Sequence, residues 1–185
     1  MNKILVPLAQ GCEEVEATTI IDLLRRGGID VTSAGLEAQI GPIKAARGTT
    51  LLPDTTLDAA LQTDYDMIAL PGGLPGADHL NDDPRIIKLV QQLAAADKYT
   101  CAICAAPRVL ARAGVLEGKR ATSYPGTLDK MEIPGMTYTG EPVTVDGKII
   151  TGRGPGTAMD FTLALLEALG GTDLKESVEG PLLRS

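Results

Sequence analysis

Trp is absent from the 185 residues of this chain, and aromatic residues make up only 3% of it. The hydrophobic core must therefore be built from Leu, Ile, Val and Ala. No apolar run approaches the roughly 20 residues that a membrane-spanning helix needs. The chain has no basic run, and 17 Lys and Arg stand against 24 Asp and Glu, a net charge of −7. Binding to nucleic acid or to an anionic membrane is therefore not expected.

Histidine and cysteine are also scarce, with one histidine and three cysteines. One histidine makes a zinc or iron site improbable, and no Walker motif is present, so we predict no metal and no cofactor. An odd number of cysteines in a chain of this length does not form the disulfide framework of a secreted protein. The N-terminus lacks the cleavage site of a signal peptide. We expect a cytoplasmic protein.

The length fits one domain over residues 1–185, and 44% hydrophobic residues indicate a globular chain. Residues 3–8, 15–26 and 29–34 predict a strand, a helix and a strand, which is a βαβ unit. Further core strands are predicted at 66–70 and 119–124 and in the run that ends at Cys104. This alternation predicts an α/β fold with a mostly parallel sheet covered on both faces, in which ligands bind beyond the carboxyl ends of the strands.

Shorter patterns complete this prediction. Residues 43–52 suggest a small hairpin excursion, 57–61 one helical turn, and Asp83-Pro84 the start of a helix. A two-residue turn at Asp146-Gly147 predicts a hairpin over 143–151. We expect a helix over 157–169, stopped by Gly170-Gly171, and a short last helix over 174–178.

Cys104 ends an apolar run that suits a buried strand, and the helical pattern 107–113 follows at once. A strand that turns directly into a helix lifts the residue at the turn above the sheet edge, as in a nucleophile elbow. The free N–H groups of the helix then point toward this residue, and the helix dipole favours thiolate over thiol. We therefore interpret Cys104 as a nucleophile rather than as a small buried hydrophobe.

Two residues are weak candidates for a partner of this thiol. Cys101 and Cys104 match C-x-x-C, but Cys101 lies inside the predicted strand, where three residues span about 10 Å, too far for a disulfide. His79 follows the glycine loop and is interpreted mainly as a solvated residue. Because Ala105, not histidine, follows the cysteine, peptidase or amidase chemistry is disfavoured.

Three acids, Glu13, Glu14 and Glu16, lie where the first loop enters the first helix. At least two are expected to be solvated partners of the helix dipole. One could turn inward, where loss of water would raise its pKa and let it carry a proton for Cys104. The residues alone do not choose among them.

Gly72 and Gly73 follow the strand at 66–70 and predict a tight turn whose N–H groups could face an oxyanion. We expect the loops 11–16, 71–76 and 104–107 to meet at the sheet edge. The spaced glycines at 152–156 match a dinucleotide fingerprint only loosely and are interpreted as a structural entry into a helix.

Four motifs together resemble the DJ-1/ThiJ/PfpI superfamily, most closely its DJ-1 branch with bacterial relatives. They occur in the family's order and span nearly the whole chain: GCEEVEA at 11–17, LPGG at 70–73, AICAAP at 102–107 and RGPGT at 153–157. The resemblance implies a three-layer, flavodoxin-like sandwich and a homodimer.

The resemblance also implies roles for single residues. Cys104 is the reactive, easily oxidised thiol, Glu16 is its carboxyl partner, and Gly72, Gly73 and Ala105 supply backbone groups beside it. Tyr124, where many relatives carry histidine, and Pro155 are expected at the pocket. Arg26 and Arg47 are expected at the dimer interface.

For function, the resemblance implies a cysteine-dependent, cofactor-free enzyme that acts on reactive α-oxoaldehydes, as a glutathione-independent glyoxalase or a deglycase of early glycation adducts, in carbonyl and oxidative stress defence. The alternative is a redox-sensing stress protein or chaperone that signals through oxidation of Cys104 to the sulfinic acid. The natural substrate, the role of Cys12 and any protein partner are not determined by the sequence.

Overall fold

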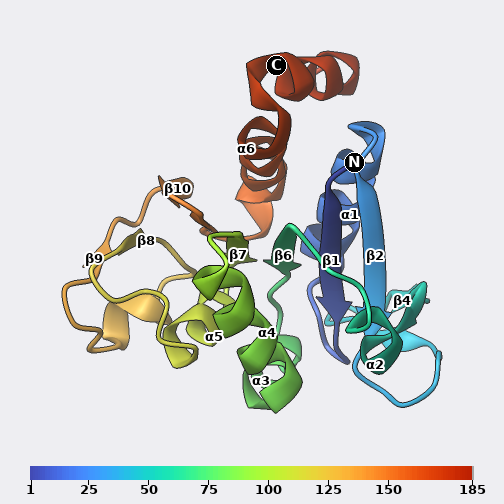
Figure 1. Ribbon diagram of the computed structural model, residues 1–185, viewed down its shortest axis with the longest axis horizontal. Helices are drawn as coiled ribbons and strands as arrows, with labels where there is room; N and C mark the ends of the chain where they lie inside the picture. The colour runs from blue at the N-terminus through green and yellow to red at the C-terminus, as the bar shows by residue number, and fades with distance from the viewer. Residues whose placement is uncertain (185) are drawn as a thin grey trace.

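A computed structural model describes residues 1–184 (Figure 1). A seven-stranded sheet runs through its centre in the order β10-β11-β7-β6-β1-β2-β5. All neighbours in this sheet pair in parallel except β10 and β11, so the predicted mostly parallel α/β sheet is confirmed. The seven strands are β1 (Lys3–Leu8), β2 (Asp30–Gly35), β5 (Thr55–Thr56), β6 (Met67–Leu70), β7 (Tyr99–Ile103), β10 (Val143–Asp146) and β11 (Ile149–Gly152).

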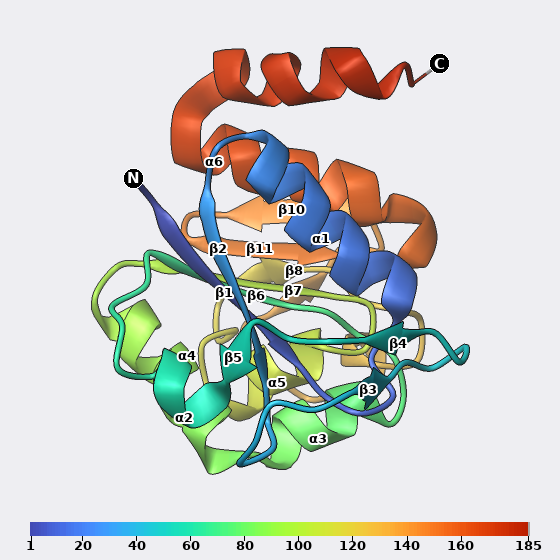
Figure 2. The ribbon, with the colours of Figure 1, turned by 90° about the vertical axis from the view of Figure 1, so that its right-hand side faces the viewer.

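Helices cover both faces of the sheet, which gives the three-layer sandwich (Figures 1 and 2). One face packs against α1 and α6 and the other mainly against α2, α4 and α5, with a separate hydrophobic core on each side. The β1 strand is completely apolar from Ile4 to Leu8 because both of its faces are buried. The helices are α1 (Glu14–Arg26), α2 (Leu57–Ala60), α3 (Gly76–Asp82), α4 (Pro84–Ala95), α5 (Pro107–Arg112) and α6 (Ala158–Glu179), with short 3-10 turns at Leu128–Lys130, Pro155–Thr157 and Gly180–Leu182.

Several local predictions hold. The excursion at 43–52 is a hairpin of β3 (Ile43–Lys44) and β4 (Thr50–Leu51) outside the central sheet. Asp83 caps α4 by accepting a hydrogen bond from the N–H of Arg85 at 2.9 Å. One helix was not predicted: α3 begins at Gly76, directly after the glycine loop.

The prediction of a core strand at 119–124 is wrong. Only Arg120–Ala121 forms a strand, β8, and it pairs with β9 (Thr137–Tyr138) in a separate two-stranded sheet. The place beside β7 is occupied by β11, so the hairpin 143–152 belongs to the central sheet. The N–H of Thr122 donates to Oγ1 of Thr151 at 2.9 Å. The side chain of Thr151 thus satisfies this buried N–H group in place of a neighbouring strand.

The last helix changes direction at Gly171, whose φ of 77° and ψ of −176° are not helical. Figure 2 shows the second part turning sharply across the top of the molecule. Leu174 and Val178 of this part pack onto the core beside α1. The prediction that the helix stops at Gly170-Gly171 and that a separate short helix follows is therefore confirmed. The two helices are the two parts of α6.

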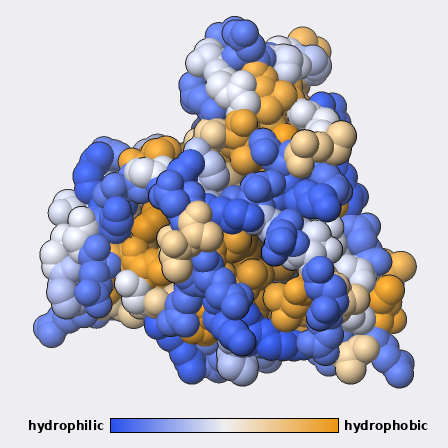
Figure 3. Space-filling view, viewed as in Figure 1, coloured by the Kyte–Doolittle hydropathy of each residue, from blue (hydrophilic) through white to orange (hydrophobic). Residues whose placement is uncertain are grey.

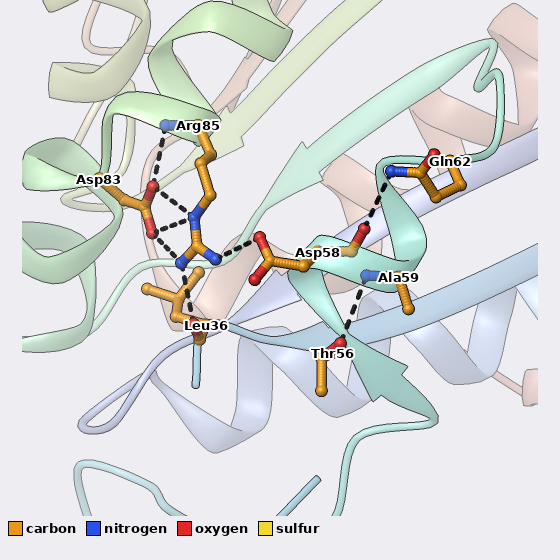
Figure 4. Close-up of polar contacts among 7 residues, drawn as sticks. All are labelled: Leu36, Thr56, Asp58, Ala59, Gln62, Asp83 and Arg85. Atoms are coloured by element: carbon orange, nitrogen blue, oxygen red, sulfur yellow. Dashed lines mark hydrogen bonds and ion pairs between the residues drawn. The ribbon is translucent and has the colours of Figure 1, made fainter. Parts of the chain in front are cut away.

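Arg85 ties three elements together on the face away from α1 (Figure 4). Its guanidinium pairs with Asp83 at 2.6 Å and with Asp58 of α2 at 2.8 Å. A further N–H donates to the carbonyl oxygen of Leu36, just after β2, at 2.8 Å. These bonds fix the carboxyl end of β2 against α2 and α4.

None of the helices described over residues 1–184 is both long enough and apolar enough to span a membrane. The face of the molecule toward the viewer in Figure 3 is mostly hydrophilic, with apolar surface in the hollows between the helices.

Candidate active site

Cys104 forms a sharp turn between β7 and α5. Its φ is 65°, a left-handed value that is uncommon outside glycine. Its N–H donates to the carbonyl oxygen of Gly152 at 2.9 Å, which extends the pairing of β7 with β11 by one residue. The side chain is 9% exposed, whereas Cys12 and Cys101 are fully buried. The elbow predicted from the sequence is therefore present, and its thiol is the most accessible of the three.

Backbone N–H groups from two loops surround the sulfur of Cys104. The N–H groups of Gly73 and Ala105 donate hydrogen bonds to it and favour the thiolate. Gly73 reaches this position with a φ of 88°, which glycine adopts without strain. Gly72 has another task, because its N–H donates to Oε2 of Glu16 at 2.7 Å. Of the three predicted backbone residues, Gly73 and Ala105 face the thiol and Gly72 holds its carboxyl partner.

Glu16 is the acid that turns inward. Its side chain is fully buried, and Oε1 has no hydrogen-bond partner among the described residues. Burial raises the pKa of Glu16 to about 7, against the hydrogen bonds from Gly72 and Cys104, which lower it. A carboxyl group with this pKa and one unpaired oxygen can both accept and donate a proton near neutral pH.

The expectation that at least two of the three acids are solvated is wrong, since Glu13 and Glu14 are 9% and 8% exposed. The carboxylate of Glu14 accepts hydrogen bonds from the N–H groups of Arg47, at 3.0 Å, and Thr49, at 3.3 Å. Burial raises its pKa, but hydrogen bonds from its own backbone N–H, first, and then from Arg47 and Thr49 outweigh burial and lower it. Glu14 thus holds the β3–β4 hairpin against α1 and does not face Cys104.

The helix dipole was predicted to favour the thiolate of Cys104, which would lower its pKa. The net shift of this pKa is in the opposite direction. Burial first, and then the charge and hydrogen bond of Glu16, raise the pKa of Cys104 to about 12, although the elbow N–H groups oppose the rise. α5 has only six residues, so its dipole is short. Because a proton on Glu16 removes the charge that opposes the thiolate, the thiol and the carboxyl group titrate as a coupled pair.

Close packing brings the pair together. A methyl carbon at Gly72 would lie 2.8 Å from Cβ of Cys104 and 2.9 Å from Oε2 of Glu16. These two atoms are therefore at most about 6 Å apart, with the Gly72 backbone between them. A methyl carbon at Gly73 would lie 2.3 Å from the backbone nitrogen of Glu13. The loops 11–16, 71–76 and 104–107 meet as predicted, and only glycine fits at this junction.

The other two thiols have no such surroundings. Cys101 lies within β7 and packs in the core, as predicted. Cys12 is buried against the backbone of Gly76, and burial, with the charge of Glu14 next, raises its pKa to about 11. All three cysteines are free thiols.

Tyr124 and Pro155, which the resemblance assigns to the pocket, lie together, and the backbone of Tyr124 contacts the elbow. The N–H of Tyr124 donates to the carbonyl oxygen of Cys104 at 2.8 Å, and the side chain is 53% exposed. Both residues line a cavity of about 360 Å³.

His79 is not part of this site. It is exposed on α3 and lines a different cavity, together with Leu8 and Leu36. Arg26 and Arg47 are also exposed, and Arg26 pairs with Asp22 of α1 at 2.6 Å. Within residues 1–184, no group of three or more His, Cys, Asp and Glu side chains is placed to hold a metal ion.

One residue that sequence reasoning missed supports the elbow. Arg108, in the first turn of α5, donates from Nε to the carbonyl oxygen of Ala105 at 3.1 Å and pairs with Asp78 of α3. Its position three residues after Ala105 was a weak signal, because many first-turn arginines are solvated. The acid that pairs with it lies on a helix that the sequence did not predict.

The chain matches a known protein family and known relatives. The model of the DJ-1/PfpI family matches residues 2–168. Protein DJ-1 homolog B of Arabidopsis thaliana is 42% identical over 183 residues, which are 98% of this chain but only 41% of that protein. The chain therefore spans less than half the length of this relative.

Two further proteins match over nearly their full length. The glutathione-independent glyoxalase DJR-1.2 of Caenorhabditis elegans is 35% identical over 97% of this chain and 94% of its own. The crystal structure of Drosophila melanogaster DJ-1beta superposes with a TM-score of 0.93 at 38% identity, over 100% of this chain and 98% of that one.

Proposed function

The chain belongs to the DJ-1/PfpI family, and from this premise we propose that it converts reactive α-oxoaldehydes to hydroxy acids without glutathione or a cofactor, in defence against carbonyl and oxidative stress. One observation carries the proposal: a partly accessible thiol, two N–H groups and a carboxyl group with a pKa of about 7 meet at one strand end. The glyoxalase name of a relative at 35% identity supports the same class of reaction.

The first step is addition of the thiol to the aldehyde. Cys104 gives its proton to Glu16, and the thiolate sulfur forms a bond to the aldehyde carbon. The electron pair of the carbonyl bond moves to oxygen, where the N–H groups of Gly73 and Ala105 stabilise the negative charge. Protonation of this oxygen by Glu16 gives a hemithioacetal and restores the carboxylate.

The second step moves hydrogen between two carbons. Glu16 removes the hydrogen of the former aldehyde carbon as a proton, which leaves an enediolate, and returns a proton to the neighbouring carbonyl carbon. The hydroxyl proton of the first carbon passes to the oxygen of the second. The first carbon is thereby oxidised to a thioester and the second is reduced to an alcohol, so no external oxidant is needed. Water hydrolyses the thioester, releases the hydroxy acid and restores the thiol.

The test is lactate formation from methylglyoxal in the absence of glutathione. Cys104→Ser should abolish it, and Glu16→Gln should lower kcat by about 10² or more. Cys12→Ser is the matched control, because this thiol lies nearby but does not face Gly73 and Ala105. Lactate formation that survives in Cys104→Ser would refute the mechanism.

The same chemistry would act on early glycation adducts. Because free aldehyde in equilibrium with an adduct mimics such an activity, the deglycase role requires release of amine from a purified adduct faster than its spontaneous dissociation. A release rate that equals the spontaneous rate would restrict the proposal to free aldehydes.

A redox-sensing role is the second candidate, favoured by the greater exposure of Cys104 over the other two thiols. Oxidation to the sulfinic acid would place oxygens near the elbow N–H groups and a protonated Glu16. Mild peroxide should then add two oxygens to the peptide that contains Cys104. Oxidation spread over the methionines would count against this role.

We also propose that the chain forms a homodimer through the outer face of α1. Val15 is 50% exposed there, with Thr18, Asp22 and Arg26 on the same face, and Arg47 is exposed on the hairpin beside it. Sedimentation of Val15→Glu against the parent protein tests this interface, and an unchanged dimer would refute it. The cytoplasmic location stays a prediction.

A further inference from the structure

The cavity beside the elbow carries a positive charge. Its lining comprises Tyr124, Pro125, Arg153, Gly154, Pro155, Gly156 and Thr157, so Arg153 is its one charged side chain. Cys104 does not line this cavity, but two backbone hydrogen bonds hold residues at its edge against the elbow. Tyr124 donates its N–H to the carbonyl oxygen of Cys104, and the residue before Arg153, Gly152, accepts the N–H of Cys104.

The guanidinium of Arg153 is not neutralised by an acid of the described chain. Its Nη1 donates to the carbonyl oxygen of Gly140 at 3.1 Å, and no carboxylate within residues 1–184 forms an ion pair with it. The acid that follows Gly140 in the chain, Glu141, pairs with Arg120, at 3.6 Å. Arg153 therefore retains N–H donors that can bind an anion, and a guanidinium fork matches a carboxylate.

The walls of the cavity suit a short carbon chain. A methyl carbon at Gly154 would lie 3.4 Å from Cδ2 of Tyr124, so the absence of a side chain leaves the tyrosine ring accessible at this point. Pro155 and Pro125 add apolar surface. A volume of about 360 Å³ would hold on the order of ten groups the size of a water molecule, enough for a few carbon atoms and a carboxylate.

We infer that Arg153 is a specificity-determining residue and that the site prefers α-oxoaldehydes that carry a carboxylate a few bonds from the aldehyde. The aldehyde would meet Cys104 while the carboxylate binds Arg153 beside Tyr124. The choice of substrate class depends on the proposed function, but the carboxylate site itself does not.

The first test needs no turnover. Iodoacetate and iodoacetamide alkylate a thiolate by the same reaction, and only iodoacetate carries a carboxylate. The ratio of the two rates at Cys104, measured by peptide mass, should fall about tenfold in Arg153→Gln through loss of attraction for iodoacetate alone. Lys88→Gln, which removes an exposed charge on α4, should leave the ratio unchanged. An unchanged ratio in Arg153→Gln, or equal slowing of both reagents, would overturn the carboxylate site.

The second test compares 4,5-dioxopentanoate with its neutral analogue 2-oxopentanal. The parent protein should show a higher kcat/KM for the acid, and Arg153→Gln should lose this preference while it retains activity on the neutral aldehyde. Equal kcat/KM values in the parent would overturn the substrate class even if the alkylation ratio depends on Arg153. If the parent converts neither aldehyde, the proposed function and the substrate class fail together, and the alkylation ratio alone decides whether the carboxylate site exists.

Discussion

Replacement of Glu16 by Gln should lower the pKa of Cys104 and so increase the reactivity of its thiol. The charge and the hydrogen bond of Glu16 both raise the pKa of this thiol, after burial. Glutamine keeps the shape of the side chain and an oxygen that can accept the N–H of Gly72, but it carries no charge. The substitution therefore removes the electrostatic effect with little change in packing.

The size of the effect follows from the separation of the two groups. Cβ of Cys104 and Oε2 of Glu16 are at most about 6 Å apart. At an effective dielectric constant of about 20, two unit charges at this distance repel by about 3 kcal/mol. That energy equals about two pKa units, so the thiolate fraction at a pH well below the pKa should rise about 100-fold. The nucleophilicity of the sulfur falls with its pKa, and the net gain in alkylation rate should be about tenfold.

The assay is the pH dependence of Cys104 alkylation by iodoacetamide, followed by peptide mass above the pKa of Glu16. Glu13→Gln is the matched control, because it removes an acid of the same loop that is not among the groups raising the pKa of Cys104. The Glu16→Gln profile should move to lower pH and the control should not. A profile that stays in place or moves to higher pH would refute the coupling of the two groups.

Three further predictions concern stability. Because the pKa of Glu16 rises from 4.5 to about 7 on folding, the folded state binds more protons between these values and the free energy of unfolding should fall as pH rises through this range. The fall should amount to about 3 kcal/mol, and Glu16→Gln should remove it. Calorimetry at pH about 5 and at pH about 8 measures the fall, and an equal fall in the variant would contradict this prediction. Gly72→Ala should lower the free energy of unfolding in urea by about 1–3 kcal/mol, because the new methyl carbon meets Cys104. Gly180→Ala is the control, since a methyl carbon there has no atom within 4 Å. Equal urea midpoints for the two variants would refute the prediction. Gly171→Ala should cost about 1–3 kcal/mol, because a φ of 77° with a ψ of −176° is essentially restricted to glycine, and it should speed hydrogen exchange over 172–179. Unchanged exchange would argue against a fixed turn there.

The central sheet could be predicted where both faces of a strand are buried, because such strands are uninterrupted apolar runs, as at 3–8 and 66–70. The same rule failed at 119–124. There Thr122 and Ser123 are buried through hydrogen bonds to Thr151, Glu141 and Leu128, and a local pattern cannot reveal these distant partners.

The position of Cys104 could be predicted because it depends on a local event, a strand that passes directly into a helix. Glu16 could not be chosen from the residues alone, because all three acids of its loop are buried. Glu14 is covered by the hairpin at 43–51, which is about 30 residues away in the sequence. The direction of the thiol pKa depended on burial and on the charge of Glu16, which only the packed loops determine.

The most direct measurement of the central claim is the lactyl hydroxamate that hydroxylamine releases from the peptide containing Cys104, after brief reaction with methylglyoxal and an acid quench. Hydroxylamine is needed because the thioester and the hemithioacetal are isomers with the same mass, and only the thioester yields a hydroxamate. A thioester of lactate on Cys104 should appear in the parent protein and decay as free lactate forms. In Glu16→Gln the thioester should not accumulate, because the transfer of hydrogen between the two carbons is blocked. Lactate formation without a thioester on Cys104, or with the adduct on Cys12, would contradict the account.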